Sequence, residues 1–332
     1  MRRLLQADRV AQRVRKWLGD SGAGTVHSLF RRVCNLDWGD WIISLHASAT
    51  GHLPGGIGVG GDVDFSQLGL RQGQPVQWRS DQVCLYLGNH TLSLRRASLA
   101  PVAATPLTAL PAPDLMAARR DLLQGWLGSH GRGLLGAQVT KAPVPEGGSF
   151  QGAAARAAWE RGQRLCDSLL NGAETAIGPG VAGLLGLGEG LTPSGDDLIL
   201  GMMAAFAHCR LALKPSLAAR VQRLMECVDH MAPRVTTRIS ANYLRLGALG
   251  EFSETLGDAT VALLGTSTRS EAVGQAIVRL LESGHSSGTD TATGLYLGIT
   301  VLMAQHRQAN DRGLYSEYRT TFEANSVHPG NR

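Results

Sequence analysis

The sequence predicts an α+β protein in which a small N-terminal antiparallel β domain precedes a larger, mainly helical domain. Over residues 25–100, short apolar runs rich in β-branched residues alternate with Gly, Asp and Asn, which is typical of strands and turns. From about residue 115, apolar residues recur at spacings of three and four among many Ala and Leu, which is typical of helices. We therefore expect a β-rich domain over residues 1–100 and a helical domain over residues 115–307.

Five segments of the first domain have strand character and follow a short amphipathic lead-in. They are residues 26–36, 41–46, 76–79, 83–87 and 91–94. The segment LPGGIGVGGDVDF, residues 53–65, contains too many glycines for a plain strand and predicts a loop with close backbone contacts.

A proline-rich segment separates the two domains. Residues 99–114 contain four prolines and no glycine, so they cannot sustain a helix, and we place a semi-rigid linker at residues 101–114. The spacing then predicts helices over residues 115–128, 152–170, 196–210, 216–230, 234–247, 257–265, 270–283 and 290–306. The polar segment 308–332 is expected to form a flexible tail.

The composition excludes several classes of protein. With 332 residues and 43% hydrophobic content, the chain can fill two cores of ordinary size. No apolar run approaches the roughly 18 residues of a membrane span, and charges interrupt the N-terminal segment, so we expect neither a membrane span nor a signal peptide. The five widely spaced cysteines favour a reducing cytoplasm. The net charge of +5 comes from scattered basic residues with few aromatics, which favours a solvated surface over a nucleic-acid interface.

One short pattern, S-G-x-D-x-x-x-G, occurs twice in the helical domain and is the best clue to function. The first copy runs from Ser194 to Gly201 and the second from Ser287 to Gly294. Each follows a loop rich in glycine and hydroxyl residues and opens an apolar stretch, as helix N-termini with free backbone amides do. Two such glycine-rich helix N-termini predict one ligand site built from two related halves.

The repeated residues also have a structural interpretation. Ser194 and Ser287 suit N-cap positions, and Asp197 and Asp290 suit the capping-box position three residues later. The glycine that ends each copy costs about 0.5–1 kcal/mol in a helix relative to Ala. We therefore expect the two helices to pack closely at these glycines, against each other or against a common partner.

Residues that capping does not require are candidates for chemistry. Asp196 is a further carboxylate and His285 a titratable group beside the second copy, so we predict that both are catalytic. Arg238, in a polar cluster, is the candidate to hold a substrate carboxylate. The other predicted anion-binding residues are Gly188, Gly190, Thr192, Ser194, Gly195, Ser286, Ser287 and Gly288. Because the carboxylates repel an anion, a divalent cation such as Mg²⁺ near Asp196 and Asp197 is an alternative to the arginine. No histidine pair has metal-ligand spacing.

Three sequence blocks resemble those of the AllH-like family. They are GLGEGLTPSGDD at residues 186–197, GHSSGTDTATG at 284–294 and FRRVCNL at 30–36. The family has been catalogued as a domain of unknown function, and its named member is a subunit of bacterial oxamate carbamoyltransferase from allantoin degradation. The resemblance spans roughly residues 25–305. It implies a carbamoyltransferase subunit that acts on oxamate or oxalurate with carbamoyl phosphate, and other subunits of the complex as partners.

Two other function classes fit the same residues. One is a non-catalytic subunit that binds a small anion or forms a scaffold, with the glycine-rich helix starts as a partner interface. The other is an Asp-based divalent-metal hydrolase or lyase. Neither class requires a membrane or a nucleic acid as partner.

Overall fold

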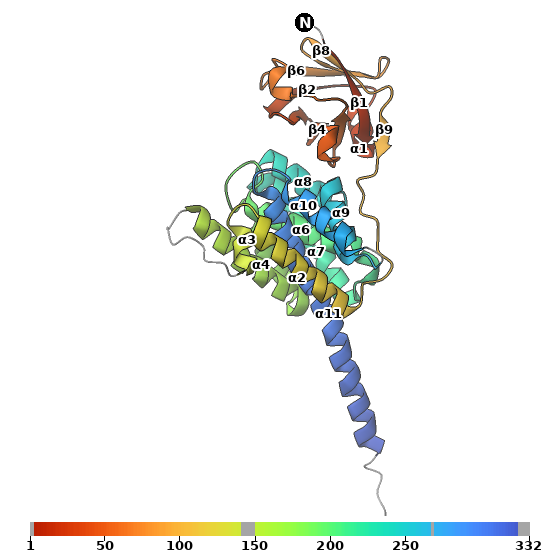
Figure 1. Cartoon of the computed structure of the whole chain (residues 1–332), viewed down its shortest axis with the longest axis vertical. Helices are drawn as coiled ribbons and strands as arrows, with labels where there is room; N and C mark the ends of the chain where they lie inside the picture. The colour runs from red at the N-terminus through yellow and green to blue at the C-terminus, as the bar shows by residue number, and fades with distance from the viewer. Residues whose placement is uncertain (1–2, 141–149, 267–268, 325–332) are drawn as a thin grey trace, which may run out of the picture.

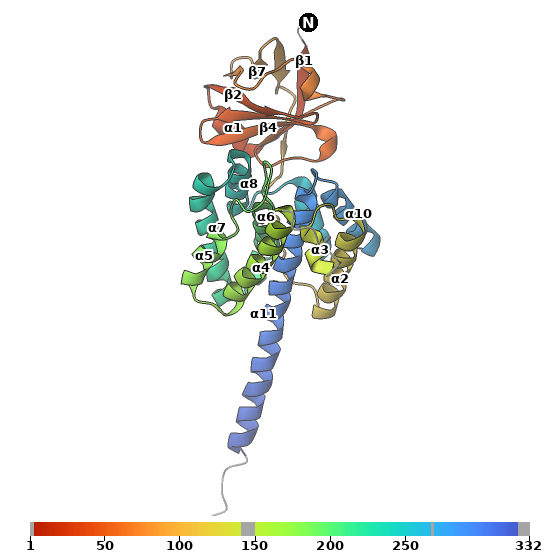
Figure 2. The ribbon, with the colours of Figure 1, turned by 90° about the vertical axis from the view of Figure 1, so that its left-hand side faces the viewer.

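The computed structural model describes residues 3–140, 150–266 and 269–324. A β domain lies above a helical domain, and the chain crosses once from the first to the second (Figure 1). Figure 2 shows the same two bodies from the side. Among the described residues, no helix is both long and apolar enough to cross a membrane.

The β domain is an eight-stranded barrel with one additional strand. Its strands are β1 (Leu4–Ala11), β2 (Ser21–Leu29), β3 (Val33–Trp38), β4 (Trp41–Ala47), β5 (Gly56–Val59), β6 (Pro75–Arg79), β7 (Cys84–Leu87), β8 (His90–Ser93) and β9 (Ser98–Ala100). Their order is β5-β4-β3-β2-β6-β7-β8-β1-β9, and a second pairing of β1 with β5 closes the ring. Closure leaves no free edge among the eight strands, and β9 pairs with β1 outside the ring.

The sheet is mixed, so the prediction of a purely antiparallel domain was wrong. β1 pairs in parallel with β8 and β9, and β4 pairs in parallel with β5, whereas the other neighbours are antiparallel. Strand direction depends on how the connections cross the barrel, and a local pattern of apolar residues carries no information about it.

Several segments of the barrel differ from the sequence prediction: the predicted run 26–36 is divided between β2 and β3, and β9 was not predicted. The lead-in contains β1 and the helix α1 (Gln12–Leu18), because Leu5, Ala7 and, after a β-bulge, Val10 point into the core despite the charged residues before Val10. The glycine-rich segment 53–65 contains β5, although its close backbone contacts were predicted correctly. A Cβ at Gly56 would lie 2.7 Å from Leu53 O, so this strand requires glycine.

The helical domain is arranged around one buried helix, α6 (Ser194–His208). The other helices are α2 (Pro113–His130), α3 (Leu135–Thr140), α4 (Phe150–Asn171), α5 (Ile177–Ala182), α7 (Pro215–Val235), α8 (Arg238–Ala248), α9 (Glu254–Leu264), α10 (Ser270–Leu281) and α11 (Ser287–Ala324). Of these, α3 and α5 were not predicted, because six residues are too few to show helical periodicity. Residues 198–207 of α6 are apolar on every face of the helix, as expected for a helix enclosed by others.

α11 is continuous from Ser287 to Ala324 and extends beyond the rest of the domain (Figures 1 and 2). It therefore includes residues 308–324, where the sequence predicted a tail, whereas residues 325–332 lie outside the described residues.

α6 and α11 pack closely at the glycines of the repeat, as the sequence predicted. A Cβ at Gly201 would overlap the carbonyl oxygen of Thr291, and a Cβ at Gly294 would overlap that of Leu198. A Cβ at Gly298, one turn further on, would lie 2.7 Å from the Cβ of Ala205. These glycines let the two backbones touch, which brings the first turns of the two helices together.

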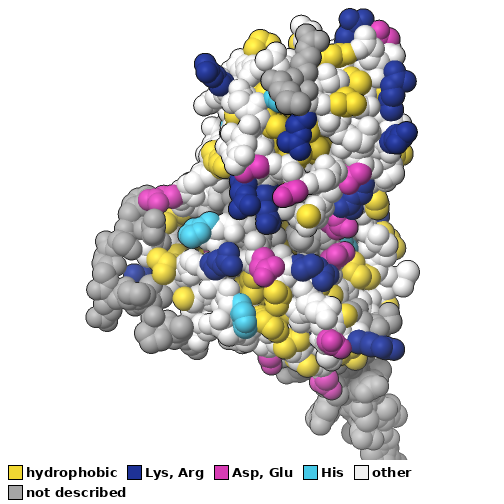
Figure 3. Space-filling model, turned by 45° about the horizontal axis from the view of Figure 1, so that its top comes forward, with side chains coloured by type: hydrophobic (Ala, Val, Ile, Leu, Met, Phe, Trp, Pro, Cys, Tyr) yellow, Lys and Arg dark blue, Asp and Glu magenta, His cyan; other side chains and the backbone are white. Residues whose placement is uncertain are grey.

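Polar contacts join the barrel to the helical domain. Asn242 of α8 accepts a hydrogen bond from Ile42 N (3.0 Å) and donates one to Ile42 O (3.3 Å). Ion pairs join Arg9 to Glu254 (3.0 Å) and Arg13 to Glu251 (2.5 Å). Figure 3 shows side chains of both charges gathered where the two domains meet.

Candidate functional site

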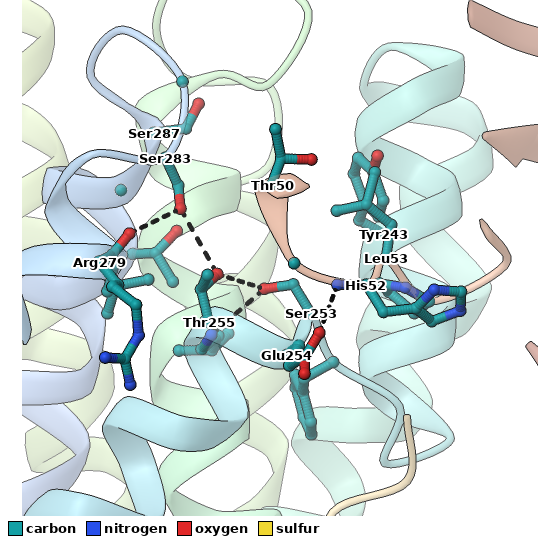
Figure 4. Close-up of a pocket in the computed structure, with 18 of the residues that line it drawn as sticks. Thr50, His52, Leu53, Tyr243, Ser253, Glu254, Thr255, Arg279, Ser283 and Ser287 are labelled. Carbon is teal, nitrogen blue, oxygen red and sulfur yellow. Dashed lines mark hydrogen bonds between the residues drawn. The ribbon is translucent and has the colours of Figure 1, made fainter. Parts of the chain in front are cut away.

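A cavity of about 850 Å³ lies between the two domains. The barrel contributes residues 48–54, the loop that follows β4, together with Arg9, Arg32 and Val33. The helical domain contributes the first turns of α6, α9 and α11 and parts of α8 and α10. Figure 4 shows Thr50 and Leu53 of the barrel loop close to Ser253 and Thr255 of α9 and to Ser287 of α11.

Three helix N-termini therefore meet at this cavity. The sequence predicted those of α6 and α11, whereas α9 was not predicted to take part. Ser253 caps α9 by accepting a hydrogen bond from Leu256 N (3.3 Å). Thr255 Oγ1 lies 3.4 Å from Ser283 Oγ, which joins the start of α9 to the loop before α11 (Figure 4). Because each N-terminus carries a partial positive charge, the cavity suits an anionic ligand.

Three arginines line the same cavity. Arg9 pairs with Glu254, and Arg279 lies 3.6 Å from Asp258. Arg32, in the FRRVCNL block, is exposed and has no ion pair among the described residues. This guanidinium is therefore available to a ligand at the edge of the cavity.

The serines and aspartates of the repeat bind one another across the two helices. Ser194 Oγ donates to Asp290 Oδ2 (2.7 Å), and Asp197 accepts hydrogen bonds from Ser287 and Thr192. The N-cap of α6 is Pro193 and has no side-chain capping bond, so the prediction that Ser194 caps this helix was wrong. In the tertiary structure, the hydroxyl of Ser194 binds the carboxyl of the opposite helix and does not cap its own.

The two carboxyls at this crossing have raised pKa values. For Asp197, burial and then the neighbouring charge of Asp290 raise the pKa well above its usual value. For Asp290, burial raises the pKa to about 6, against hydrogen bonds from Ser194 and Ser286 that lower it. Both groups therefore hold a proton more readily than an exposed carboxyl does.

Asp196 does not line the cavity. Its carboxyl accepts hydrogen bonds from Gly186 N (2.8 Å), from Ser240 Oγ (2.7 Å) and from Thr236 Oγ1. Burial is the main cause that raises its pKa. These contacts hold the glycine-rich loop against the junction of α7 and α8, so the structure does not bring Asp196 to the cavity wall, and its catalytic role stays a prediction.

Two further predicted residues also lie away from the cavity lining. His285 is exposed on the loop before α11. Arg238 donates to the Asp37 carboxyl and to the carbonyl oxygen of Gly39, so it joins α8 to the turn between β3 and β4. The sequence pattern gave no indication of this contact between domains.

Some of the remaining predicted residues line the cavity, and the others lie outside its lining. Thr192, Ser287 and Gly288 line the cavity, and Thr192 Oγ1 lies 2.6 Å from Ser287 Oγ. The remaining predicted residues that do not line the cavity are Gly188, Gly190, Ser194, Gly195 and Ser286. Among them, Gly195 has no room for a Cβ because it packs on Leu184 O.

Sequence reasoning missed most polar residues of the wall, among them His52, Tyr243 and Glu251. His52 Nδ1 lies 3.2 Å from His46 Nε2, and burial lowers the pKa of these histidines to about 3 and about 4 respectively. The sequence gave no indication that His52 belongs to a site, because it lies in no motif. Tyr243 directly follows the polar cluster around Arg238, and this position could have indicated it.

Buried polar atoms without partners gather at this cavity. Among the described residues, four buried side-chain atoms lack a hydrogen-bond partner: His52 Nε2, His90 Nδ1, Asp197 Oδ2 and Glu251 Oε2. Three of the four belong to residues that line the cavity. Such atoms are rare in folded proteins and are costly, so their concentration in one place indicates a binding site.

The described residues contain no group of three or more His, Cys, Asp or Glu side chains arranged to hold a metal ion. The divalent cation considered near Asp196 and Asp197 stays a prediction.

Comparison with known families identifies the chain. The model of the AllH family N-terminal domain matches residues 3–99, and that of the oxamate carbamoyltransferase subunit AllH matches residues 184–299. The chain belongs to the AllH family. It is therefore a subunit of the carbamoyltransferase that acts on oxamate, with a role in allantoin degradation.

Every residue that lines the cavity falls within the two ranges matched by the AllH family, whereas α2, α3 and α4 lie outside them. The resemblance that the three sequence blocks indicated is thus confirmed. No solved structure matches the chain.

Proposed function

We propose that the cavity between the barrel and the helical domain is the active site of the carbamoyltransferase, where oxamate or oxalurate binds together with phosphate or carbamoyl phosphate. The observation that carries this proposal is the concentration of unpartnered buried polar atoms, from His52, Asp197 and Glu251, in one cavity. A ligand that bonds to these atoms recovers the free energy lost when they were buried.

The chemistry of the reaction agrees with the wall of the cavity. Carbamoyl transfer requires a place for a carboxylate and a phosphate, and hydrogen-bond donors for the carbonyl oxygen as it gains charge. Three helix N-termini and the Arg32 guanidinium provide positive charge. The hydroxyls of Thr50, Thr255 and Ser287 provide donors near the same space (Figure 4).

We further propose that the chain works in the cytoplasm with the other carbamoyltransferase subunits. The family description as a subunit supports a complex. The five buried, free cysteines are compatible with a reducing compartment.

Neighbouring arginines allow a matched test in the reconstituted complex. Arg32 lines the cavity, whereas Arg31 is exposed and lies 3.8 Å from Asp64 outside it. We expect Arg32→Gln to raise the KM for oxalurate by about 10-fold or more, because a hydrogen bond between charged groups contributes about 1.5–3 kcal/mol. Arg31→Gln should leave KM at the parent value.

Equal KM values for the parent and Arg32→Gln would place the substrate elsewhere. A loss of complex assembly in size-exclusion chromatography, with KM unchanged in the complex that still forms, would support the scaffold function instead.

A further inference from the structure

We infer that Asp197 is the catalytic residue of this cavity and that its carboxyl relays a proton between phosphate and the nitrogen of oxamate. The inference rests on the proposed function, since it takes the cavity as the place where the substrates bind.

The position of Asp197 distinguishes it from the other carboxyls of the repeat. It lies in the first turn of α6, is 5% exposed and lines the cavity. Ser287 and Thr192 donate to its carboxyl, yet Oδ2 has no hydrogen-bond partner among the described residues. Asp196 and Asp290 do not line the cavity, and hydrogen bonds from neighbouring residues engage each of them.

The other acidic residues of the wall differ from Asp197 in a second way. Three of them are neutralised by arginines, in the pairs Arg13–Glu251, Arg9–Glu254 and Arg279–Asp258, and the fourth, Glu282, is exposed to solvent. No arginine or lysine pairs with Asp197 among the described residues. A buried carboxyl without a cation is stable as the neutral acid.

Burial and the neighbouring carboxyls raise the pKa of Asp197, against hydrogen bonds from Ser287 and Thr192 that lower it. Asp290 faces it from α11 and Asp196 lies beside it on α6, and both charges raise its pKa, after the larger effect of burial. Tyr243 of α8 has a raised pKa, chiefly through burial, and therefore stays neutral. Asp197 is thus held as an acid that can give up its proton to a stronger base and take one back.

The proposed step balances without an oxidant, a reductant or a cofactor. When oxalurate is cleaved, an oxygen of hydrogen phosphate forms a bond to the carbamoyl carbon. The bond from this carbon to the oxamate nitrogen breaks, and its electron pair goes to nitrogen. Nitrogen takes the proton of Asp197, and the carboxylate takes the proton of the phosphate. The products are oxamate and carbamoyl phosphate, and the reverse reaction follows the same path.

The test compares Asp197→Asn with Asp196→Asn in the reconstituted complex. We expect Asp197→Asn to lower kcat by about 10²–10⁴-fold, as the loss of a general acid does, with the KM for oxalurate changed by less than about threefold. In the parent, kcat in the cleavage direction should fall as pH rises through the pKa of Asp197. This pH-dependent fall in kcat should disappear in Asp197→Asn. It should persist in Asp196→Asn at a slightly lower pH, because the charge of Asp196 is the smallest of the causes that raise the pKa of Asp197.

A second measurement does not depend on turnover. Infrared spectra of the folded parent at neutral pH should contain the C=O stretch of a protonated carboxyl, which Asp197→Asn should lack. If Asp197→Asn fails to fold, Asp197→Glu replaces it, and the alkaline limb of kcat should then move to a different pH.

A parent without the infrared band, or an Asp197→Asn complex with nearly parental kcat and the same limb, would overturn the inference. Failure of the proposed function would appear differently, as a KM for oxalurate that does not respond to Arg32→Gln.

Discussion

Ser194 Oγ lies 2.7 Å from Asp290 Oδ2, so the hydroxyl of one copy of the repeat donates to the carboxyl of the other. The reciprocal pair joins Ser287 of the second copy to Asp197 of the first. The two helix starts therefore hold each other in place, and the sequence repeat encodes this exchange.

Replacing Ser194 with Ala should destabilise the protein. The change leaves the buried Asp290 carboxyl short of one donor, which costs about 1–3 kcal/mol. Denaturation in urea measures the difference. Ser129→Ala on the exposed end of α2 is the control, and a similar small loss in both variants would contradict a special role for the Ser194–Asp290 bond.

Replacing Gly201 with Ala should disrupt the crossing of α6 and α11, because the new methyl group would overlap Thr291 O. We expect a loss of about 1–3 kcal/mol or more. The control is Gly125→Ala, the same substitution within helix α2. Its new Cβ would lie in open space, so this change should be neutral or stabilise the protein by up to about 1 kcal/mol. Equal thermal midpoints for the two variants would argue against backbone contact at Gly201.

The pair His46 and His52 should make stability depend on pH. Their folded-state pKa values are lowered to about 4 and about 3, from an ordinary value of 6.5 for histidine. The stability that they contribute is fully present above pH 6.5 and is lost as pH falls through their folded-state pKa values, because the unfolded chain binds protons first.

Other groups titrate in the same pH range. The informative quantity is therefore the difference in unfolding free energy between His52→Gln and the parent at each pH. The variant should lose less stability between pH 6.5 and pH 4 than the parent does. Parallel curves of unfolding free energy against pH would show that His52 is already protonated in the folded state.

Arg238→Gln should leave substrate affinity unchanged, contrary to the role predicted from the sequence. Its partners are Asp37 and the carbonyl of Gly39, and the side chain is 45% exposed, so the expected loss of stability is at most about 1 kcal/mol. Steady-state kinetics measures the effect on KM, and urea denaturation measures the effect on stability. An increase of tenfold or more in KM would restore the arginine to the substrate site.

Local patterns were sufficient to predict the main elements of the helical domain. The apolar spacing of α6 to α11 repeats over enough turns to be recognised, and the glycines of the repeat correctly predicted the close contact of α6 with α11. The parallel pairs of the barrel were missed, because β1 and β8 are distant in sequence and their relative direction depends on the whole ring.

For the candidate site, too, some features could be predicted from the sequence and others depended on the tertiary structure. The sequence by itself predicted that Thr192 and Ser287 lie close together, because Thr192 precedes one copy of the motif and Ser287 opens the other. Only the tertiary structure decided which carboxyl faces the cavity. Asp196 and Asp197 are adjacent, but they point about 100° apart on a helix. The first therefore meets the donors Gly186 and Ser240, and the second meets the cavity.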